Sequence, residues 1–171
     1  MSDNNKTNEF LQKLAPCIKR GELEKCVEGA AQEAGEMGIG AEDLLKLCGQ
    51  KIGENPDIAY VLSLTAEHGL DGKEKYRAYV VAACAAHSIN KFEKSEYYYK
   101  KAIELRPDEA RLHYLLAGTL YPLKKKSEAE KHFKKAIELE PKNAEAHALY
   151  GLFLLLENKF EEANKEITLS S

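Results

Sequence analysis

The seven residues KAIELRP at 101–107 return almost unchanged as KAIELEP at 135–141. Their final prolines, Pro107 and Pro141, are 34 residues apart. Self-similarity with a period of about 20 to 50 residues is typical of solenoids and arrays, in which each repeat is one small structural unit. Extending this period in both directions predicts three repeats, at residues 76–109, 110–143 and 144–171, the last of them shortened.

Four further positions of the repeat carry matched residue types. Small residues at two of them would let paired helices approach closely, and an aromatic ring would fill the space between the helices. Proline would end the second helix, because it has no backbone N–H and disfavours helix for the residue before it. The fourth position holds Tyr79, His113 and His147, and the eighth holds Ala83, Ala117 and Gly151. The twentieth position holds Ser95, Ala129 and Ala163, and the twenty-fourth holds Tyr99, Phe133 and Ile167.

This joint spacing resembles the tetratricopeptide repeat (TPR) family over roughly the last 96 residues. The resemblance implies an all-α fold, a right-handed α-α superhelix of stacked antiparallel helix pairs (a TPR-like solenoid). It also implies an adaptor or scaffold that holds another protein or a peptide segment in the concave groove of the repeats. Such a protein is not an enzyme.

In the TPR family the first helix of each pair lines the groove, so the resemblance places contact residues at set positions. Arg77 and Arg111 would pair with acidic residues of a partner, while Tyr114 and Tyr121 would offer rigid contact area. The alternative is that these are ordinary solvated arginines and partly buried tyrosines. The groove candidates are Arg77, Val80, Cys84, His87, Arg111, Tyr114, Gly118, Tyr121, Glu145, Ala148, Leu152 and Leu155.

Co-chaperones of this family hold a partner's terminal carboxylate with lysine, asparagine and arginine at certain groove positions. The equivalent positions here are Val80, Cys84, Leu115, Glu145 and Leu149, none of which can take that role. We therefore expect that heat-shock chaperone tails do not bind.

The turns between paired helices also repeat, as NKFE at 90–93 and again at 158–161. We expect Asn90 and Asn158 to cap the second helices, with a glutamate three residues later completing a capping box. In the middle repeat Pro122 predicts an early end of the first helix. A looser turn over residues 122–126 would follow, with a displaced cap at Ser127.

The third repeat is unusually apolar, because leucine and phenylalanine fill residues 152–156. A helix that is apolar on nearly all sides is normally buried, yet only a short helix follows it. We expect exposed apolar surface near Leu152 and Leu155, of the kind that marks a contact. The alternative function is a structural or assembly subunit that self-associates as a homo-oligomer or docks through this repeat. In the simplest reading these residues only pack against the preceding repeat.

The first 75 residues show helical spacing without a clear repeat. Residues 1–8 are polar, and we expect them to be mobile. Residues 9–75 are predicted to form degenerate helical pairs that cap the array, with Asn55-Pro56 starting one of the helices. A third alternative is a small enzyme or cofactor carrier that uses this half.

Composition argues against several other classes of protein. The net charge of −3 provides no field to attract nucleic acid or an anionic membrane. No stretch approaches the roughly 18 apolar residues of a membrane span, and the N-terminus lacks the apolar segment of a secretion signal. A cytoplasmic protein without nucleic-acid or membrane partners is therefore expected.

The cysteines and histidines form no catalytic or metal-binding pattern. Cys17, Cys26, Cys48 and Cys84 lack CxxC spacing and are expected to be reduced, buried thiols. Among the histidines, which include His68, matching repeat positions explain His113 and His147 without a metal. Because phosphate-binding and hydrolase motifs are also missing, we expect no cofactor, no metal and no catalytic residue.

Overall fold

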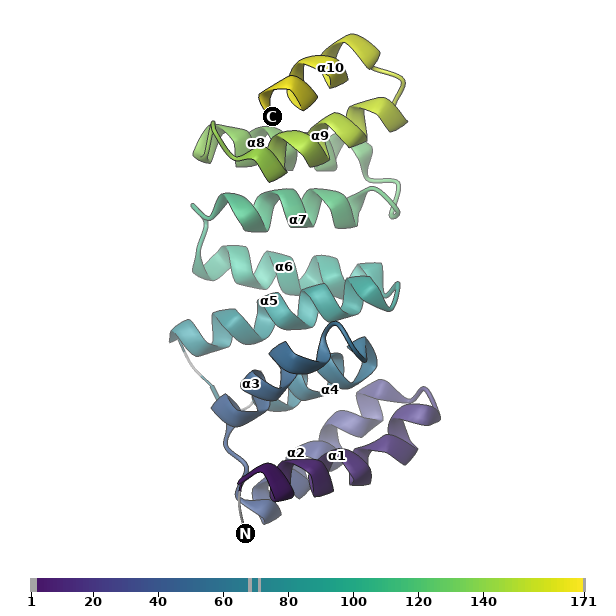
Figure 1. The fold of residues 1–171 in the computed structure, drawn as a ribbon, viewed down its shortest axis with the longest axis vertical. Coiled ribbons are helices and arrows are strands. Elements are labelled where there is room, and N and C mark those ends of the chain that lie inside the picture. Colours follow the sequence, from purple (N-terminus) through teal and green to yellow (C-terminus); the bar gives the residue numbers. More distant parts are fainter. Residues whose placement is uncertain (1–2, 68, 71, 171) are drawn as a thin grey trace. The chain divides into compact units, whose positions relative to one another are not determined.

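The computed structural model describes residues 3–67, 69–70 and 72–170 (Figure 1). These residues form ten α-helices and no strand, which confirms the predicted all-α fold. The helices are α1 (Asp3–Lys19), α2 (Leu23–Met37), α3 (Ala41–Lys51), α4 (Pro56–Glu67), α5 (Gly72–Ser88), α6 (Phe92–Leu105), α7 (Ala110–Leu120), α8 (Lys126–Leu139), α9 (Ala144–Leu156) and α10 (Phe160–Leu169).

The chain divides into two compact units, Met1–Lys91 and Phe92–Ser171. The first unit contains α1 to α5 and the second contains α6 to α10. The boundary lies inside the first predicted repeat, so α5 and α6, expected as one helix pair, belong to different units.

Helix α4 forms the centre of the first unit. All residues from Ala59 to Ala66 are buried, and the helix packs against α2, α3 and α5. Its start follows the sequence signal, since the side-chain oxygen of Asn55 accepts a hydrogen bond from the Ile58 N–H at 3.2 Å. Pro56 occupies the first helical position, where its missing N–H costs nothing.

Helix α1 begins earlier than expected. Residues 3–8 were expected to precede the first helix, whereas the structure places them in its first turns. Phe10 and Leu14 are buried, and α1 packs against α2. Tertiary packing of such an apolar face supplies most of a helix's stability, so the polar first turns extend from an anchored segment.

The prediction that all four cysteines are free thiols is wrong. Cys17 in the last turn of α1 and Cys26 in the first turn of α2 form a disulfide, with Cα atoms 5.8 Å apart. Gly21 reverses the chain between them with a φ of 74°, a conformation that suits glycine. Cys48 and Cys84 are free thiols, and burial raises the pKa of the Cys48 thiol to about 12.

The second unit contains the helix pairs that the period predicts. Helix α7 pairs with α8, α9 pairs with α10, and successive pairs pack against one another (Figure 1). The small residues Ala117, Ala129 and Ala163 are 0% exposed. Phe133 of α8 lies against Tyr150 and Phe153 of α9, with ring centroids 5.5 and 5.4 Å apart. The core of this unit thus consists of small residues and rings at repeating positions.

At Gly151, helix α9 lies close against α10. A Cβ atom added there would lie 2.7 Å from Cγ1 of Ile167 and 3.4 Å from the carbonyl oxygen of Ala163. Ile167 stands one period after Phe133, which is 2% exposed, but Ile167 itself is 39% exposed. The absence of a side chain at residue 151 therefore lets the two helices meet directly.

The turns between paired helices differ from the prediction. Asn90, Lys124 and Asn158 occupy equivalent positions, with left-handed φ values of 58°, 60° and 60°. In each turn the next residue's N–H bonds to a carbonyl five residues back, which closes the end of the first helix. These hydrogen bonds are Lys91 to Ala86, Lys125 to Leu120 and Lys159 to Leu154. The asparagines therefore end the first helix, because asparagine tolerates the left-handed conformation, and they do not cap the second.

The first helix of the middle repeat ends early, as Pro122 predicted, because α7 ends at Leu120, two residues before the position equivalent to the end of α9 at Leu156. Pro122 lies within a turn of the same backbone pattern, since Lys124 has the same left-handed conformation as the asparagines. Helix α8 begins at Lys126 after Lys125, which makes no side-chain capping bond. Ser127 is consequently inside the helix, and the predicted displaced cap is wrong.

Candidate functional site

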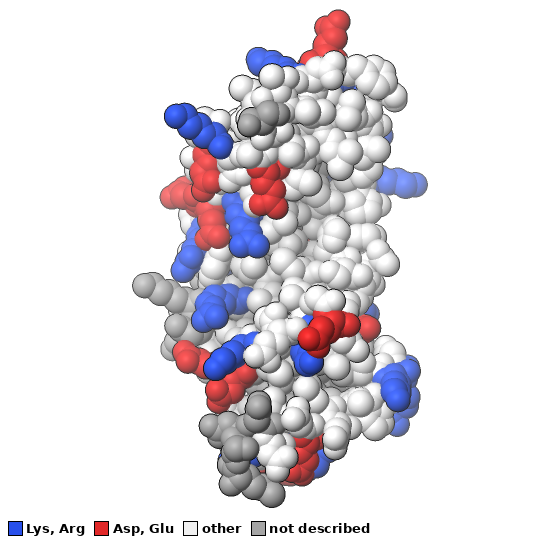
Figure 2. All heavy atoms as spheres, viewed as in Figure 1, with Lys and Arg blue, Asp and Glu red and all other residues white. Residues whose placement is uncertain are grey.

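Helices α7 and α9 contact each other in the second unit, and the viewed face over their C-terminal halves carries little charge (Figure 2). On α9, Leu152 is 52% exposed and Ala148 is also exposed. On α7, Gly118 has open space where a side chain would begin. Exposed apolar groups beside such an opening suit contact with a partner. We define the α7/α9 surface as Arg111, Gly118, Tyr121, Ala148 and Leu152.

Charged groups gather at the opposite ends of the same helices. Arg111 lies in the first turn of α7 and Glu145 in the first turn of α9, and both are exposed. The surface therefore changes from charged to apolar along each helix.

Tyr114 is not an accessible contact residue, which corrects the sequence interpretation. Its side chain is 2% exposed, and its hydroxyl donates a hydrogen bond to Oε2 of Glu145 at 2.5 Å. Burial, followed by this bond to a carboxylate, raises the pKa of Tyr114. The two predicted groove residues thus meet each other and connect α7 to α9.

Two other candidates are half-buried at the C-terminal ends of these helices. Tyr121 follows α7 and lies edge-on to Phe153 of α9, with ring centroids 5.8 Å apart. Leu155 is half-buried on α9. The contact with Phe153 holds the Tyr121 ring in place, so its remaining exposed part is presented in a fixed orientation.

The candidates of the first repeat lie on α5, in the first unit. Arg77 and His87 are exposed there, while Val80 and Cys84 are half-buried. Within the second unit, the structure brings together predicted residues of α7 and α9, whereas those of α5 belong to the first unit.

Histidine side chains have a structural role that the sequence did not reveal. Nε2 of His113 lies 2.8 Å from the carbonyl oxygen of Pro107, and Nε2 of His147 lies 3.0 Å from that of Pro141. Both histidines are at least 94% buried, being 6% and 3% exposed. The repeated histidine therefore ties the start of each first helix to the proline turn before it. Its signal in the sequence was the constant distance to the preceding proline.

A second repeating network consists of ion pairs. Glu96 on α6 binds Lys125 at 2.7 Å, and one period later Glu130 on α8 binds Lys159 at 2.9 Å. Each glutamate also binds the lysine four residues ahead of it. Burial acts against ionisation of Glu96, but its two lysine partners together lower its pKa. These pairs connect one repeat's second helix to the next repeat's turn, at a separation that the period could have revealed.

Apolar side chains are also exposed around the end of α9 and along α10. Their exposed fractions range from 39% to 58%, which is high for residues of this size. The third repeat therefore carries exposed apolar surface, as expected near Leu152. The residues are Leu152, Leu156, Phe160, Ile167 and Leu169.

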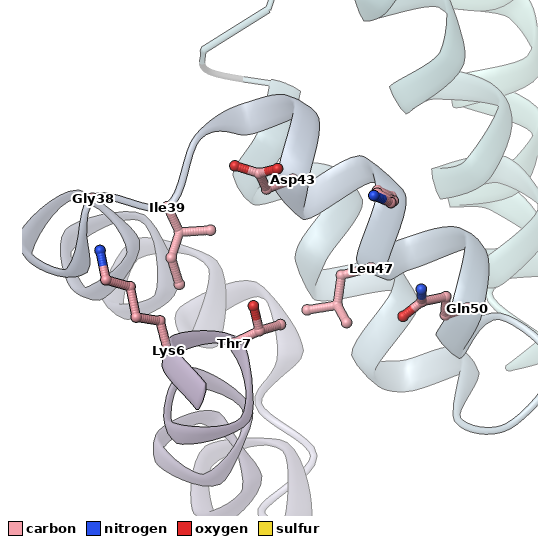
Figure 3. A pocket seen from close by; sticks show the side chains of 8 residues that line it. Lys6, Thr7, Gly38, Ile39, Asp43, Leu47 and Gln50 are labelled. Atoms are coloured by element: carbon pink, nitrogen blue, oxygen red, sulfur yellow. The ribbon is translucent and has the colours of Figure 1, made fainter. Parts of the chain in front are cut away.

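The first unit contains a polar hollow of about 200 Å³ between α1, the α2–α3 turn and α3 (Figure 3). Lys6 and Thr7 line it from α1, and Asp43 and Gln50 line it from α3. It holds no group of three or more potential metal ligands, nor does any other part of the described chain. His68 lies outside the described residues. Among the described helices, none is long and apolar enough to cross a membrane.

Comparison with known proteins places these features in a family. Two family models, both described as tetratricopeptide repeat, match this chain: one at residues 76–109 and 110–143, the other at residues 132–163. Together the matches span just over half of the chain. Comparison with curated proteins gives no match.

Solved structures of several proteins share the fold. A crystal structure of MamA has 19% identity and a TM-score of 0.69, with 89% of this chain and 88% of MamA covered. Pseudomonas aeruginosa PilF has 17% identity and a TM-score of 0.66 over 99% of this chain and 77% of its own. YrrB, described as a TPR protein with an unusual peptide-binding site, has 15% identity and a TM-score of 0.67 over 94% of this chain and 82% of its own. Together with the family models and the helix pairs, these similarities show that the chain belongs to the tetratricopeptide repeat family.

Proposed function

We propose that this protein is an interaction scaffold that binds a peptide segment of another protein on the α7/α9 surface. The observation that carries the proposal is the side chain of Leu152 on α9, which is 52% exposed. Helix α9 packs against α7, where Gly118 leaves open space in place of a side chain. Leu156, four residues further along the same helix, is also 52% exposed, and exposed apolar side chains that lie together indicate an interaction surface.

The charge distribution indicates what kind of peptide would fit. Arg111 at the start of α7 is exposed and would attract an acidic side chain, in a charge-assisted hydrogen bond. Gly118 and Leu152, toward the other end of the two helices, would receive an apolar side chain. The preferred segment therefore carries an acidic residue and an apolar residue separated along its length.

Rigidity of the surface supports this role. The bond from Tyr114 to Glu145 and the contact of Tyr121 with Phe153 hold α7 and α9 in one arrangement. Because the receptor is already ordered, the entropic cost of binding falls mainly on the peptide. The family relationship to YrrB, whose description names a peptide-binding site, is consistent with this use, and the proposal includes no catalytic reaction.

A selection from a displayed library of random peptides tests the proposal. Synthetic copies of the enriched peptides would be titrated against the wild type, Leu152→Ser and Leu105→Ser. Leu105 is a matched control, since it is 46% exposed but lies at the end of α6. We expect Leu152→Ser to weaken binding by about tenfold or more, as for a hot-spot residue, and Leu105→Ser to have little effect. Failure to enrich any peptide, or equal losses in both variants, would refute the proposal.

A second candidate function is self-association through the third repeat. Phe160 and Leu169 on α10 are 58% and 54% exposed, and neither lies on α7 or α9. Sedimentation of the wild type beside a Phe160→Ser, Leu169→Ser variant measures this directly. Association that disappears in the variant supports this function, whereas a monomer at all concentrations eliminates it.

The cellular location is a separate part of the proposal. A cytoplasmic location, expected from the sequence, would keep thiols reduced, but the structure pairs Cys17 with Cys26. Quenching intact cells in acid and then modifying the denatured protein with a maleimide distinguishes the two situations, because Cys48 is buried in the folded protein. Four modified cysteines per molecule support the cytoplasm, and modification of Cys48 and Cys84 alone supports an oxidising compartment.

A further inference from the structure

Two histidines face each other between α7 and α8. Nδ1 of His113 lies 3.0 Å from Nδ1 of His132, and the ring planes are inclined by 22°. The ring centroids are 5.3 Å apart. The centroid separation exceeds the nitrogen-to-nitrogen distance by about the sum of the two ring radii. Both nitrogens therefore lie close to the line that joins the ring centroids. The two rings therefore meet nitrogen to nitrogen.

The hydrogen bonds fix where the protons are. A carbonyl oxygen only accepts, so Nε2 of His113 must donate to Pro107. In its neutral form His113 then presents the lone pair of Nδ1 toward His132. Nδ1 of His132 must donate the proton of the shared hydrogen bond. One proton between the two facing nitrogens satisfies both rings.

This geometry limits how many protons the folded pair can hold. A first added proton can bind Nε2 of His132 and leave the shared hydrogen bond intact. A second would have to bind Nδ1 of His113, which would place two N–H donors and two positive charges 3.0 Å apart. In the unfolded chain both rings protonate independently near pH 6.5. The folded state therefore binds at least one proton fewer than the unfolded state in acid.

The surroundings make even the first proton unfavourable. Burial, followed by the neighbouring His113 ring and by Lys100 on α6, lowers the pKa of His132, and Glu128 on α8 opposes this effect only in part. The stability that the pair contributes is fully present above the unfolded pKa and decreases as the pH falls below it.

The next repeat contains the same arrangement with the opposite charge preference. Glu166 stands one period after His132, and its Oε2 lies 2.6 Å from Nδ1 of His147. A carboxylate and the Pro141 carbonyl both accept, so His147 must carry protons on both nitrogens. Burial opposes this charge, but the bonds to Pro141 and Glu166 outweigh burial and raise the pKa of His147. The contribution of this pair is fully present below the unfolded pKa and decreases as the pH rises through the folded pKa.

We propose that the His113–His132 pair is an acid-sensitive latch that loosens α7 from α8 on mild acidification, while the His147–Glu166 pair keeps α9 closed on α10. The two pairs form the same latch with one residue exchanged, so neighbouring repeats respond to pH in opposite directions. Because α7 carries Arg111 and Gly118, opening of the first latch also alters the α7/α9 surface. The inference itself concerns folding and does not depend on any peptide binding there.

Exchange of the two latch residues provides the test. His132→Glu copies the third repeat's pair into the second repeat, and Glu166→His does the reverse. His132→Gln is a milder control, since its amide can donate to or accept from His113 and does not titrate. Urea unfolding of each full-length variant would be measured at about pH 7.5 and about pH 5.5, on either side of the histidine range. Amide hydrogen exchange in α7–α8 and α9–α10, corrected for intrinsic rates, would locate the change.

Between these two pH values we expect the unfolding equilibrium constant of the wild type to rise at least about tenfold relative to His132→Gln. His132→Glu should be more stable at the lower pH, relative to the wild type. In Glu166→His, amide hydrogen exchange in α9–α10 should increase in acid. If His132→Glu does not fold, the proposal is tested by comparing amide exchange in α9–α10 between Glu166→His and the wild type. Equal pH dependence in the wild type and His132→Gln, or acid-induced exchange in α9–α10 without any in α7–α8 of the wild type, would overturn the proposal.

Discussion

Replacement of Gly151 by alanine tests how tightly the helix pairs are packed. The new Cβ atom would lie 2.7 Å from Cγ1 of Ile167, closer than two carbon atoms can approach without displacement. Because Ile167 is β-branched and its χ1 is confined in a helix, rotation does not relieve the clash and α10 must shift. Overpacking of this kind costs about 1–3 kcal/mol, and the helix preference of alanine over glycine offsets about 0.5–1 kcal/mol. We expect a net loss of about 1 kcal/mol.

Gly118 provides the matched control, since it also lies inside a helix but has no atom within 4 Å of an added Cβ. Gly118→Ala should therefore raise stability by about 0.5–1 kcal/mol. Urea midpoints at constant slope measure both changes. In an Ile167→Ala background the clash is removed, and Gly151→Ala should become stabilising. If Gly151→Ala stabilises the wild type as Gly118→Ala does, the close approach of α9 to α10 described above is wrong.

Three further substitutions test other parts of the structure. Tyr114→Phe removes the 2.5 Å hydrogen bond to Glu145 and should lower the free energy of unfolding by about 1.5–3 kcal/mol, as for a bond to a charged group; no change in the urea midpoint would contradict this bond. Lys124→Gly should stabilise the protein by a few tenths to about 1 kcal/mol, because lysine is strained at a φ of 60°. Asn158→Gly should gain less in the same assay, and equal gains would argue against the left-handed turn. Cys17→Ser removes the disulfide and should cost about 2–3 kcal/mol, visible as a lower thermal midpoint; an unchanged midpoint would show that the cross-link is not formed.

Sequence periodicity was sufficient to predict the helix pairs of the second unit. Residues such as Ala117 and Phe133 recur because each pair must bury a small contact and a ring in the same place, and both are buried in the structure. The turns were harder to interpret. Asn90 and Asn158 suit both a helix start and a left-handed helix end, and only the backbone distinguishes these two roles.

The sequence could not predict how deeply a side chain is buried between helices, or which residues of neighbouring helices pair. The repeat assigned Tyr114 to the groove, but how far its side chain sinks between α7 and α9 depends on the packing of both helices. The disulfide required the angle between α1 and α2, which the spacing of Cys17 and Cys26 does not contain. Signals for the histidine latches were present, since His113 and His132 are separated by the same 19 residues as the later pair.

The central claim, that the α7/α9 surface is where a peptide binds, can be tested by paramagnetic relaxation. A selected peptide with a nitroxide at its apolar residue would be added to isotope-labelled protein, and signal loss would be measured for each backbone amide. We predict the strongest losses at Gly118 and Leu152. Strongest losses at Tyr97 on α6 or Lys131 on α8, both exposed but outside this surface, would contradict the account.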